Sequence, residues 1–309
     1  MTQKNKNIIR IGLFSIIFLG LLLIGTFYDL EISHLLAGKG LDDFSYYSND
    51  FGGRIIEYIG SFPIFVLGIF ACLIFTHKIY SLDNKKKYLS LLFIIVIIIL
   101  TEKLIGDTIK YYCRFHNNEA FYEATSTTII LYLVSIILTA VMLFFYRKVN
   151  HEINNKLVKF AYVIVGTCIG YLLIELIKSP VGRMRYRAMN LINNYSFYTP
   201  WYKISDAKHI LSGFDHIPKD GYKSFPSGHT FSAGVCYALI CMPYVVEKFN
   251  NKKWKTIWYI IPVCYTGLVG FYRIVVGAHY LTDVLVGGTI AYVLAETFKY
   301  FVYEKKNQG

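Results

Sequence analysis

Charged residues are scarce in this sequence. Asp, Glu, Lys and Arg make up only 17% of its 309 residues, whereas an ordinary soluble domain carries about 25%. Hydrophobic residues make up 55%, and the mean hydropathy is +0.42. This composition excludes a disordered tail and argues against a typical soluble domain or a free nucleic-acid-binding protein. The net charge of +12 therefore needs an explanation other than an acidic partner in solution.

Cysteine is also rare, and its spacing is uninformative. The six cysteines are Cys72, Cys113, Cys168, Cys236, Cys241 and Cys264. Five of them fall in apolar stretches, and none has the spacing of a metal-ligand set. We expect small buried hydrophobic side chains at these positions, with neither a metal site nor a disulfide framework.

Long apolar stretches fill most of the chain. A membrane-spanning helix needs about 20 mostly apolar residues, and eight stretches approach or exceed that length. They run approximately over 11–28, 55–75, 88–105, 129–146, 160–177, 230–246, 257–271 and 280–300. In lipid the backbone must satisfy its own hydrogen bonds, so we expect helices. The predicted fold class is an all-α polytopic transmembrane helix bundle of about eight spans. We expect a single membrane domain over 1–309, with an N-terminal helix pair at about 1–87 and the remaining spans in 88–309.

Basic residues alternate with the predicted spans. Five segments, at the two termini and after the second, fourth and sixth spans, hold 18 basic residues and only four acidic ones: Lys4, Lys6, Arg10; Lys78, Lys85, Lys86, Lys87; Arg147, Lys148, Lys156, Lys159; Lys248, Lys252, Lys253, Lys255; Lys299, Lys305, Lys306. Short loops rich in Lys and Arg stay in the cytoplasm. We therefore expect both termini to be cytoplasmic. The first span is expected to be retained, because no convincing signal-peptide cleavage site follows it.

One outward-facing loop breaks this charge pattern. Residues 178–223 hold eight basic residues: Lys178, Arg183, Arg185, Arg187, Lys203, Lys208, Lys219 and Lys223. A long solvated loop can escape the charge rule. Because three of the arginines fall within five residues, we favour an anion-binding site instead.

Two segments on this side suit phosphate binding. The first runs from Lys178 to Arg185, and it offers the charge and forked donors of Lys178, Arg183 and Arg185 to phosphate oxygens. The second is the sequence Pro-Ser-Gly-His at the start of the sixth span. There Ser227 can cap a helix and Gly228 permits close approach of an anion to free N–H groups. His229 would stand at the edge of that site, placed to transfer a proton.

The third segment pairs a histidine with a carboxylate. It reads Arg273-x5-His279-x3-Asp283. His279 and Asp283 share a face at a helix start, so the carboxylate can hold one imidazole nitrogen and leave the other free. That is the arrangement of an activated nucleophile or base, and Arg273 can reach the same oxyanion. A metal site is disfavoured, because no further ligands occur at suitable spacing.

Each feature is weak alone, but together they resemble a known signature. The type 2 phosphatidic acid phosphatase superfamily carries K-x6-RP, then PSGH, then SR-x5-H-x3-D. This chain has Lys178-x6-Arg185 followed by Tyr186 where the family has proline. The second motif matches fully, and in the third Tyr272 replaces serine. The motifs cover about 110 residues, within 178–283, and the resemblance implies six core helices around them.

The resemblance also implies a mechanism. His279 would attack phosphorus and form a phosphohistidine, and Asp283 would stabilise the charged imidazole. His229 would protonate the leaving oxygen and then activate water. Lys178, Arg185, Ser227, Gly228 and Arg273 would bind phosphoryl oxygens, with Arg183 as an auxiliary phosphate ligand. The family needs neither metal nor cofactor.

The expected function is hydrolysis of a lipid phosphate or pyrophosphate at the extracytoplasmic face. Undecaprenyl pyrophosphate, phosphatidylglycerophosphate and phosphatidic acid are all acceptable substrates chemically. The alternatives are a lipid phosphotransferase with the same intermediate and a non-enzymatic lipid or anion transporter. An outward site suits recycling of a bacterial polyprenyl carrier, so we expect a bacterial plasma-membrane protein. Its expected partners are the lipid substrate and membrane lipids, with no nucleic acid; the oligomeric state stays open.

Overall fold

The computed structural model describes residues 3–37, 41–42, 44–80, 87–115, 118–211 and 217–305. Within these ranges the regular structure is helical, with no strand. The helices are α1 (Gln3–Ala37), α2 (Phe51–Ile59), α3 (Phe62–Tyr80), α4 (Tyr88–Phe115), α5 (Glu119–Glu123), α6 (Thr125–Tyr146), α7 (His151–Val181), α8 (Tyr186–Leu191), α9 (Ala207–Ile210), α10 (Gly228–Gly234), α11 (Met242–Val245), α12 (Lys252–Val275) and α13 (Leu281–Lys299). The predicted all-α class is confirmed. Lys85, Lys86 and Lys306, which contribute to the predicted orientation, lie outside the described residues.

Seven helices in the described ranges are long and apolar enough to cross a membrane. They are Gly12–Ala37, Phe51–Tyr80, Tyr88–Arg114, Thr125–Tyr146, His151–Leu191, Lys252–Val275 and Leu281–Glu304. Each covers one of the predicted spans, including the short one at 257–271. The eighth expected span, at 230–246, is not among these seven helices.

The predicted sixth span is helical but broken. It consists of α10, a 3₁₀ segment (Val235–Cys241) and α11, with 7, 7 and 4 residues. Pro243 lies in the first turn of α11, where its missing N–H interrupts a continuous α-helix. A 3₁₀ turn rises about 2 Å per residue and an α-helix about 1.5 Å, so the three pieces extend about 30 Å. That length still matches the hydrocarbon core of a bilayer, about 30 Å thick.

The chain folds into two compact units, each built from segments far apart in the sequence. The first contains Met1–Ile56, Leu172–Phe231 and Gly267–Thr289, and the second contains Glu57–Tyr171, Ser232–Thr266 and Ile290–Gly309. Each unit draws on both the N-terminal and C-terminal parts of the chain. Several long helices contribute one end to each unit.

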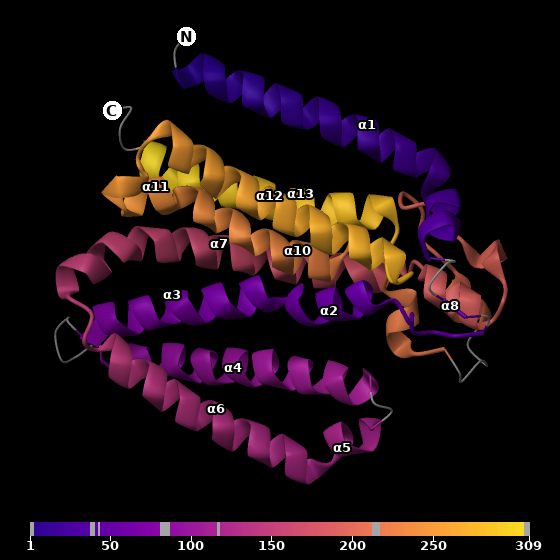
Figure 1. The fold of residues 1–309 in the computed structure, drawn as a ribbon, viewed down its shortest axis with the longest axis horizontal. Coiled ribbons are helices and arrows are strands. Elements are labelled where there is room, and N and C mark those ends of the chain that lie inside the picture. Colours follow the sequence, from indigo (N-terminus) through magenta and orange to yellow (C-terminus); the bar gives the residue numbers. More distant parts are fainter. Residues whose placement is uncertain are drawn as a thin grey trace. The chain divides into compact units, whose positions relative to one another are not determined.

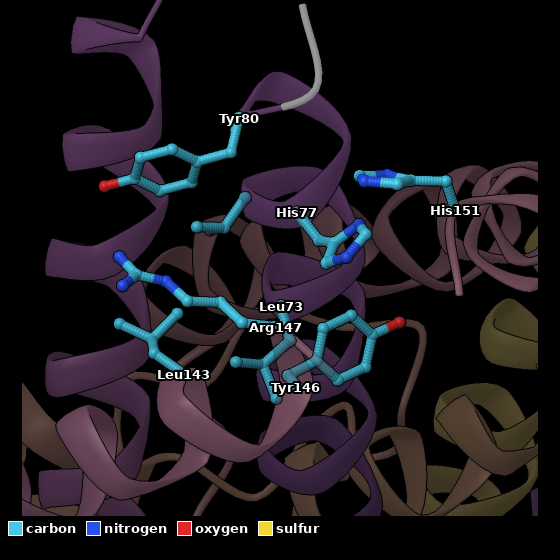
Figure 2. Close-up of a pocket in the computed structure, with 8 residues that line it drawn as sticks. Leu73, His77, Tyr80, Leu143, Tyr146, Arg147 and His151 are labelled. Carbon is cyan, nitrogen blue, oxygen red and sulfur yellow. The ribbon is translucent and has the colours of Figure 1, made fainter. Parts of the chain in front are cut away.

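The second unit is a layered helix assembly. Within it, α4 lies between α3 and α6 (Figure 1). Two clusters of buried apolar side chains hold the layers together: one contains Ile69, Cys72, Leu73 and Ile97, and the other contains Ile74, Phe160, Ile164 and Ala238 among its members. At one end of the unit a pocket of about 390 Å³ opens where α3 and α6 end and α7 begins (Figure 2).

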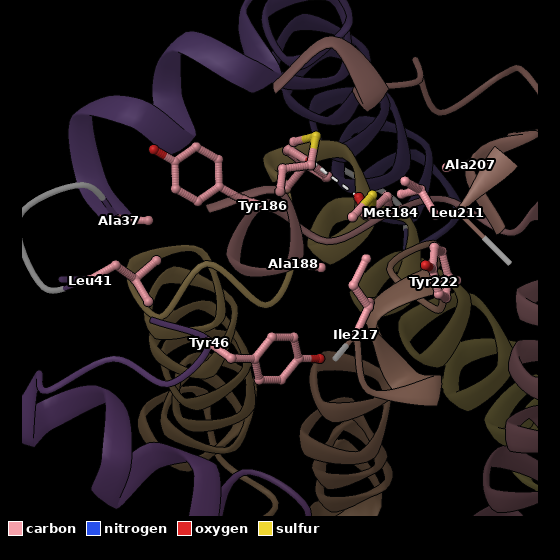
Figure 3. Packing of buried hydrophobic residues seen from close by; sticks show 12 residues of the cluster. Ala37, Leu41, Tyr46, Met184, Tyr186, Ala188, Ala207, Leu211, Ile217 and Tyr222 are labelled. Carbon is pink, nitrogen blue, oxygen red and sulfur yellow. Dashed lines mark hydrogen bonds between the residues drawn. The ribbon is translucent and has the colours of Figure 1, made fainter. Parts of the chain in front are cut away.

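The first unit packs its connecting segments around a separate core. Figure 3 shows this cluster, which includes Met184, Tyr186, Ala188, Leu211 and Tyr222. The backbone at Arg185 is extended (φ −74°, ψ 150°), so successive side chains point to opposite sides. Met184 and Tyr186 enter the core, and burial of each such side chain contributes about 1.5–3 kcal/mol. The core thereby fixes the segment that carries Arg183 and Arg185.

Candidate active site

All three predicted motifs lie in the first unit. Lys178 is in the last turn of α7, and Arg183 and Arg185 precede α8. Ser227, Gly228 and His229 stand at the start of α10, and Arg273 is in the last turn of α12. His279 lies between α12 and α13, and Asp283 is in the first turn of α13. A backbone hydrogen bond from Ser227 N to Asp283 O (3.0 Å) ties the second motif to the third.

The start of α10 is built as its sequence predicts. Ser227 caps the helix, because its Oγ accepts a hydrogen bond from the backbone N–H of Thr230 (3.3 Å). The backbone of Ser227 also packs directly on Gly287 of α13. A Cβ built at Gly287 would collide with the Ser227 carbonyl oxygen, so only glycine lets the two helices approach this closely.

The imidazole of His279 has a defined tautomer. Its Nδ1 lies 2.6 Å from the backbone carbonyl oxygen of Ser224. A carbonyl oxygen can only accept a hydrogen bond, so Nδ1 carries the proton and donates it. In the neutral ring Nε2 is therefore unprotonated and has its lone pair available. The backbone N–H of His279 donates to Arg273 O (3.1 Å), which fixes the ring's attachment point.

Asp283 supports this arrangement less directly than expected. Its Oδ2 lies 3.6 Å from His279 Nδ1, which is longer than a hydrogen bond. Oδ2 instead accepts hydrogen bonds from Ser224 Oγ (2.5 Å) and from the backbone N–H of Tyr280 (2.9 Å). Asp283 thus fixes Ser224, and the carbonyl oxygen of Ser224 holds and orients the imidazole. The charge of Asp283 also lies close to the ring.

Arg183 forms the centre of a buried ionic network. The side chain is fully buried (0% exposed). Nη1 donates to Asp283 Oδ1 (2.6 Å) and to Thr282 Oγ1 (2.9 Å), and Nε donates to Thr199 O (2.8 Å). The guanidinium also stacks on the Tyr280 ring, 4.1 Å from its centroid. With these donors directed at the protein, Arg183 is placed to hold Asp283, and its auxiliary phosphate role stays a prediction.

Asp29 completes this network from α1. Its Oδ2 accepts a hydrogen bond from Arg183 Nη2 (3.0 Å), and its Oδ1 accepts one from the backbone N–H of Thr282 (3.0 Å). The Thr282 hydroxyl also donates to Oδ2. Asp29 therefore caps the first turn of α13 from a different helix. Sequence reasoning missed this residue, although a carboxylate directly after the first apolar stretch was a signal.

Two predicted phosphate ligands are paired with acids. Lys178 Nζ lies 3.3 Å from Glu175 Oε1, and Arg185 Nη1 lies 2.9 Å from Asp220 Oδ2. Both cations are largely buried. The buried Nε of Arg185 has no hydrogen-bond partner within the described protein. An anionic ligand would supply one, and it would compete with Asp220 for the guanidinium.

Burial and positive charge keep both site histidines neutral. Burial lowers the pKa of His279 to about 3, and the charges of Arg185 and Arg273 act in the same direction, while Asp283 opposes them. The pKa of His229 is well below its usual 6.5, again mainly through burial, with Arg273 and His279 as the next causes. Both rings thus present a neutral imidazole at pH 7.

The two departures from the resembled signature have structural reasons. Tyr186 is the first residue of α8, a position where proline is also well tolerated. Its hydroxyl lies 2.8 Å from Nδ1 of His34 on α1, a contact that proline cannot make. The Tyr272 ring packs against Gly52 of α2, where a built Cβ would lie 2.6 Å from a ring carbon. Both tyrosines thus contact helices that precede the motif region.

The region that contains the motifs is similar to a known protein family. Residues 159–307 match the PAP2 superfamily, and they include every predicted site residue. This part of the chain is a PAP2-superfamily domain. The PAP2 domain contains the ends of α7, α12 and α13 that carry the motifs, whereas Asp29 lies outside it, in α1.

Three relatives resemble the chain over longer or shorter stretches. It is 26% identical over 192 residues to a probable diacylglycerol pyrophosphate phosphatase 1 of Schizosaccharomyces pombe, covering 56% of this chain and 62% of that protein. It is 29% identical over 195 residues to a probable lipid phosphate phosphatase 4 of Arabidopsis thaliana (58% and 59%). A phosphatidylglycerophosphatase B of Bacillus subtilis is 38% identical over 71 residues (23% and 35%). The chain thus spans less than two thirds of each relative. No solved structure matches it.

Among the described residues, no group of three or more His, Cys, Asp and Glu side chains is placed to hold a metal ion.

The three relatives come from a fission yeast, a plant and a bacterium, so their organisms do not distinguish a bacterial source from a eukaryotic one.

Proposed function

We propose that this chain is a membrane phosphatase that hydrolyses a lipid phosphate or pyrophosphate through a phosphohistidine on His279. The observation that carries the proposal is the fixed tautomer of His279. Its Nδ1–H donates to the Ser224 carbonyl, so Nε2 is the unprotonated nitrogen, and the charges of Arg185 and Arg273 lie near the ring. The relatives named as lipid phosphate or diacylglycerol pyrophosphate phosphatases support this substrate class.

The first chemical step is displacement at phosphorus. Nε2 of His279 forms the P–N bond as the bond between phosphorus and the leaving oxygen breaks. Lys178, Arg185 and Arg273 stabilise the charge on the transferring phosphoryl group, which is the main catalytic contribution in such reactions. The Asp283 carboxylate, held by Arg183 and Ser224, compensates the positive charge that develops on the imidazole.

His229 transfers the protons in both steps. In the empty site this ring is neutral, because burial and nearby cations lower its pKa. A bound phosphoryl group brings negative charge, which favours protonation of His229. The protonated ring then gives its proton to the leaving oxygen. In the second step the neutral ring takes a proton from water, which attacks phosphorus and breaks the P–N bond to release inorganic phosphate.

Transfer of the phosphoryl group to a second lipid or sugar would use the same intermediate, with an alcohol in place of water. No contact in the described residues favours such an acceptor. We therefore propose hydrolysis, with the substrate's chains remaining in the bilayer while its phosphate enters from the outer side. The outward orientation rests on the basic residues of the five opposite segments.

Phosphate release tests the proposal. Purified protein is incubated in EDTA with phosphatidic acid, diacylglycerol pyrophosphate, phosphatidylglycerophosphate and undecaprenyl pyrophosphate. We expect at least one of these to release phosphate, and the His279→Ala variant to lose that activity. His209→Ala, at an exposed histidine of α9, is the matched control and should retain it. Equal release by the two variants would exclude the proposed nucleophile.

Orientation is tested separately with an impermeant maleimide. Cysteine is introduced at Tyr202, an exposed position between α8 and α9, or at the exposed Lys156 near the start of α7. In intact cells we expect labelling at position 202 only. Labelling at 156 only would place the site on the cytoplasmic face.

A further inference from the structure

A second cluster of polar side chains lies in the second unit and contains no residue of the candidate active site. It lines the pocket of about 390 Å³ that opens where α3 and α6 end and α7 begins (Figure 2). The polar lining residues are Thr76, His77, Tyr80, Tyr146, Arg147 and His151, and two leucines supply the apolar part. Volumes of about 300–1,000 Å³ are typical of sites for small molecules and head groups.

Two buried polar atoms at this pocket have no partner among the described residues. Within that part of the chain, the Oγ1 of Thr76 and the Nδ1 of His77 make no hydrogen bond, although the residues are only 1% and 7% exposed. A buried polar atom left unsatisfied costs about 1–3 kcal/mol, so a ligand that pairs with both atoms would gain stability from them. A ligand with both donor and acceptor atoms would satisfy them.

The charge around the pocket is positive. The Arg147 guanidinium lies over the Tyr80 ring, 5.2 Å from its centroid, and Figure 2 shows its side chain passing beneath that ring. The rings of His77 and His151 lie 4.6 Å apart. None of the described residues that line the pocket is a carboxylate. Because α7 begins at His151, the positive end of its dipole also lies at the pocket edge.

Hydrogen bonds between the three helices hold the walls in place. The Tyr146 hydroxyl donates to Asn154 Oδ1 (3.0 Å), and Asn154 Nδ2 donates to the Ile74 carbonyl (3.3 Å). Lys78 Nζ donates to Asn155 Oδ1 (2.8 Å). These contacts join the end of α6, the start of α7 and α3. The pocket is thus preformed, which reduces the entropy lost on binding.

We propose that this pocket binds the phosphate ester of a ligand at the membrane surface. The forked donors of Arg147 would bind two phosphoryl oxygens. The Thr76 hydroxyl would donate to a third oxygen, and the imidazoles of His77 and His151 would complete the site. The leucines would contact the alkyl part of the ligand. A phospholipid head group and a soluble phosphate ester share this chemistry.

Binding measurements on the full-length protein in detergent separate the two sources. The probes are dioctanoyl phosphatidylglycerol, the same head group without chains (glycerophosphoglycerol), and dioctanoylglycerol as the phosphate-free control. Arg147→Gln is compared with Lys148→Gln, whose exposed cation lies against Phe144 and does not line the pocket. Any binding at the candidate active site contributes equally to both variants.

We expect Arg147→Gln to weaken binding of a phosphate-bearing probe at least about tenfold, which is the loss of one charge-assisted hydrogen bond. Lys148→Gln should change it less than about twofold. A loss seen with the phospholipid alone assigns a lipid ligand, and a loss seen equally with the chainless head group assigns a soluble one. If the two variants bind both probes alike, the proposal is refuted.

Thr76→Val provides a second and independent readout. Valine has nearly the same shape as threonine and removes the unpaired hydroxyl, so the ligand-free protein should melt at the same or a higher temperature. The affinity for the phosphate-bearing probe should nevertheless fall. An affinity unchanged by Thr76→Val and Arg147→Gln, or binding of Zn²⁺ in place of phosphate at the His77–His151 pair, would overturn the assignment.

Discussion

Replacement of Arg183 by lysine separates two roles for this cation. The sequence alone suggests an auxiliary phosphate ligand, whereas the side chain makes four hydrogen bonds inside the protein, two of them to the carboxylates of Asp283 and Asp29. Lysine keeps the charge but has no planar fork, so it cannot serve both carboxylates. At least one charge-assisted hydrogen bond, worth about 1.5–3 kcal/mol, is lost. With the stacking on Tyr280, we expect a loss of about 2–4 kcal/mol in unfolding free energy.

The kinetic consequence is equally specific. Because Arg183 acts through Asp283, Arg183→Lys should lower kcat and leave KM and the affinity for orthovanadate within about threefold of wild type. Arg185→Lys is the informative comparison, since its Nε is free for a ligand, and it should raise KM and weaken vanadate binding. Stability is followed by thermal melting in detergent and the kinetics by phosphate release. A rise in KM and a loss of vanadate binding in Arg183→Lys, at unchanged melting temperature, would refute this reasoning.

Three further predictions follow from the packing and the charges. Gly287→Ala drives a methyl group into the Ser227 carbonyl and should cost about 1–3 kcal/mol of stability and about 100-fold in kcat, measured by melting and phosphate release. Gly52→Ala should destabilise the protein, because the new methyl group collides with the Tyr272 ring. Adding Tyr272→Ser to that variant removes the ring and should restore the melting temperature. An unchanged melting temperature in the double variant would contradict the contact. The unfolded chain protonates His279 near pH 6.5 but the folded protein only near pH 3, so stability is complete above pH 6.5 and falls as the pH decreases. At pH 5 the loss is about 2 kcal/mol, and the difference in melting temperature between pH 7.5 and pH 5 should shrink in His279→Gln.

The sequence was sufficient for the helices and the motif positions because both depend on local patterns. Long apolar stretches predict spans directly, and the structure differs only at 230–246. There Pro243 interrupts the α-helix, yet the apolar pattern is unaffected by whether a turn is α or 3₁₀. Composition therefore identified the segment but not its geometry.

The hydrogen bonds of the site could not be predicted from the sequence, because they join segments that lie far apart along the chain. Ser224 holds the imidazole through a backbone carbonyl, a group that every residue has and no motif marks. Asp29 reaches Arg183 and Thr282 from 154 and 253 residues away. The spacing of His279 and Asp283 correctly predicted proximity, but side chains four apart on a helix start need not hydrogen-bond, and here the distance is 3.6 Å.

The central claim is that Nε2 of His279 becomes phosphorylated, and trapping the intermediate tests it most directly. Protein is mixed with a ³²P-labelled lipid phosphate that it hydrolyses, quenched in alkali after milliseconds to seconds, and digested for peptide mapping. We predict acid-labile, alkali-stable label on the peptide that contains His279, attached at Nε2, and no label in His279→Ala. Label on another residue, or rapid hydrolysis with no labelled protein at any time point, would contradict the account.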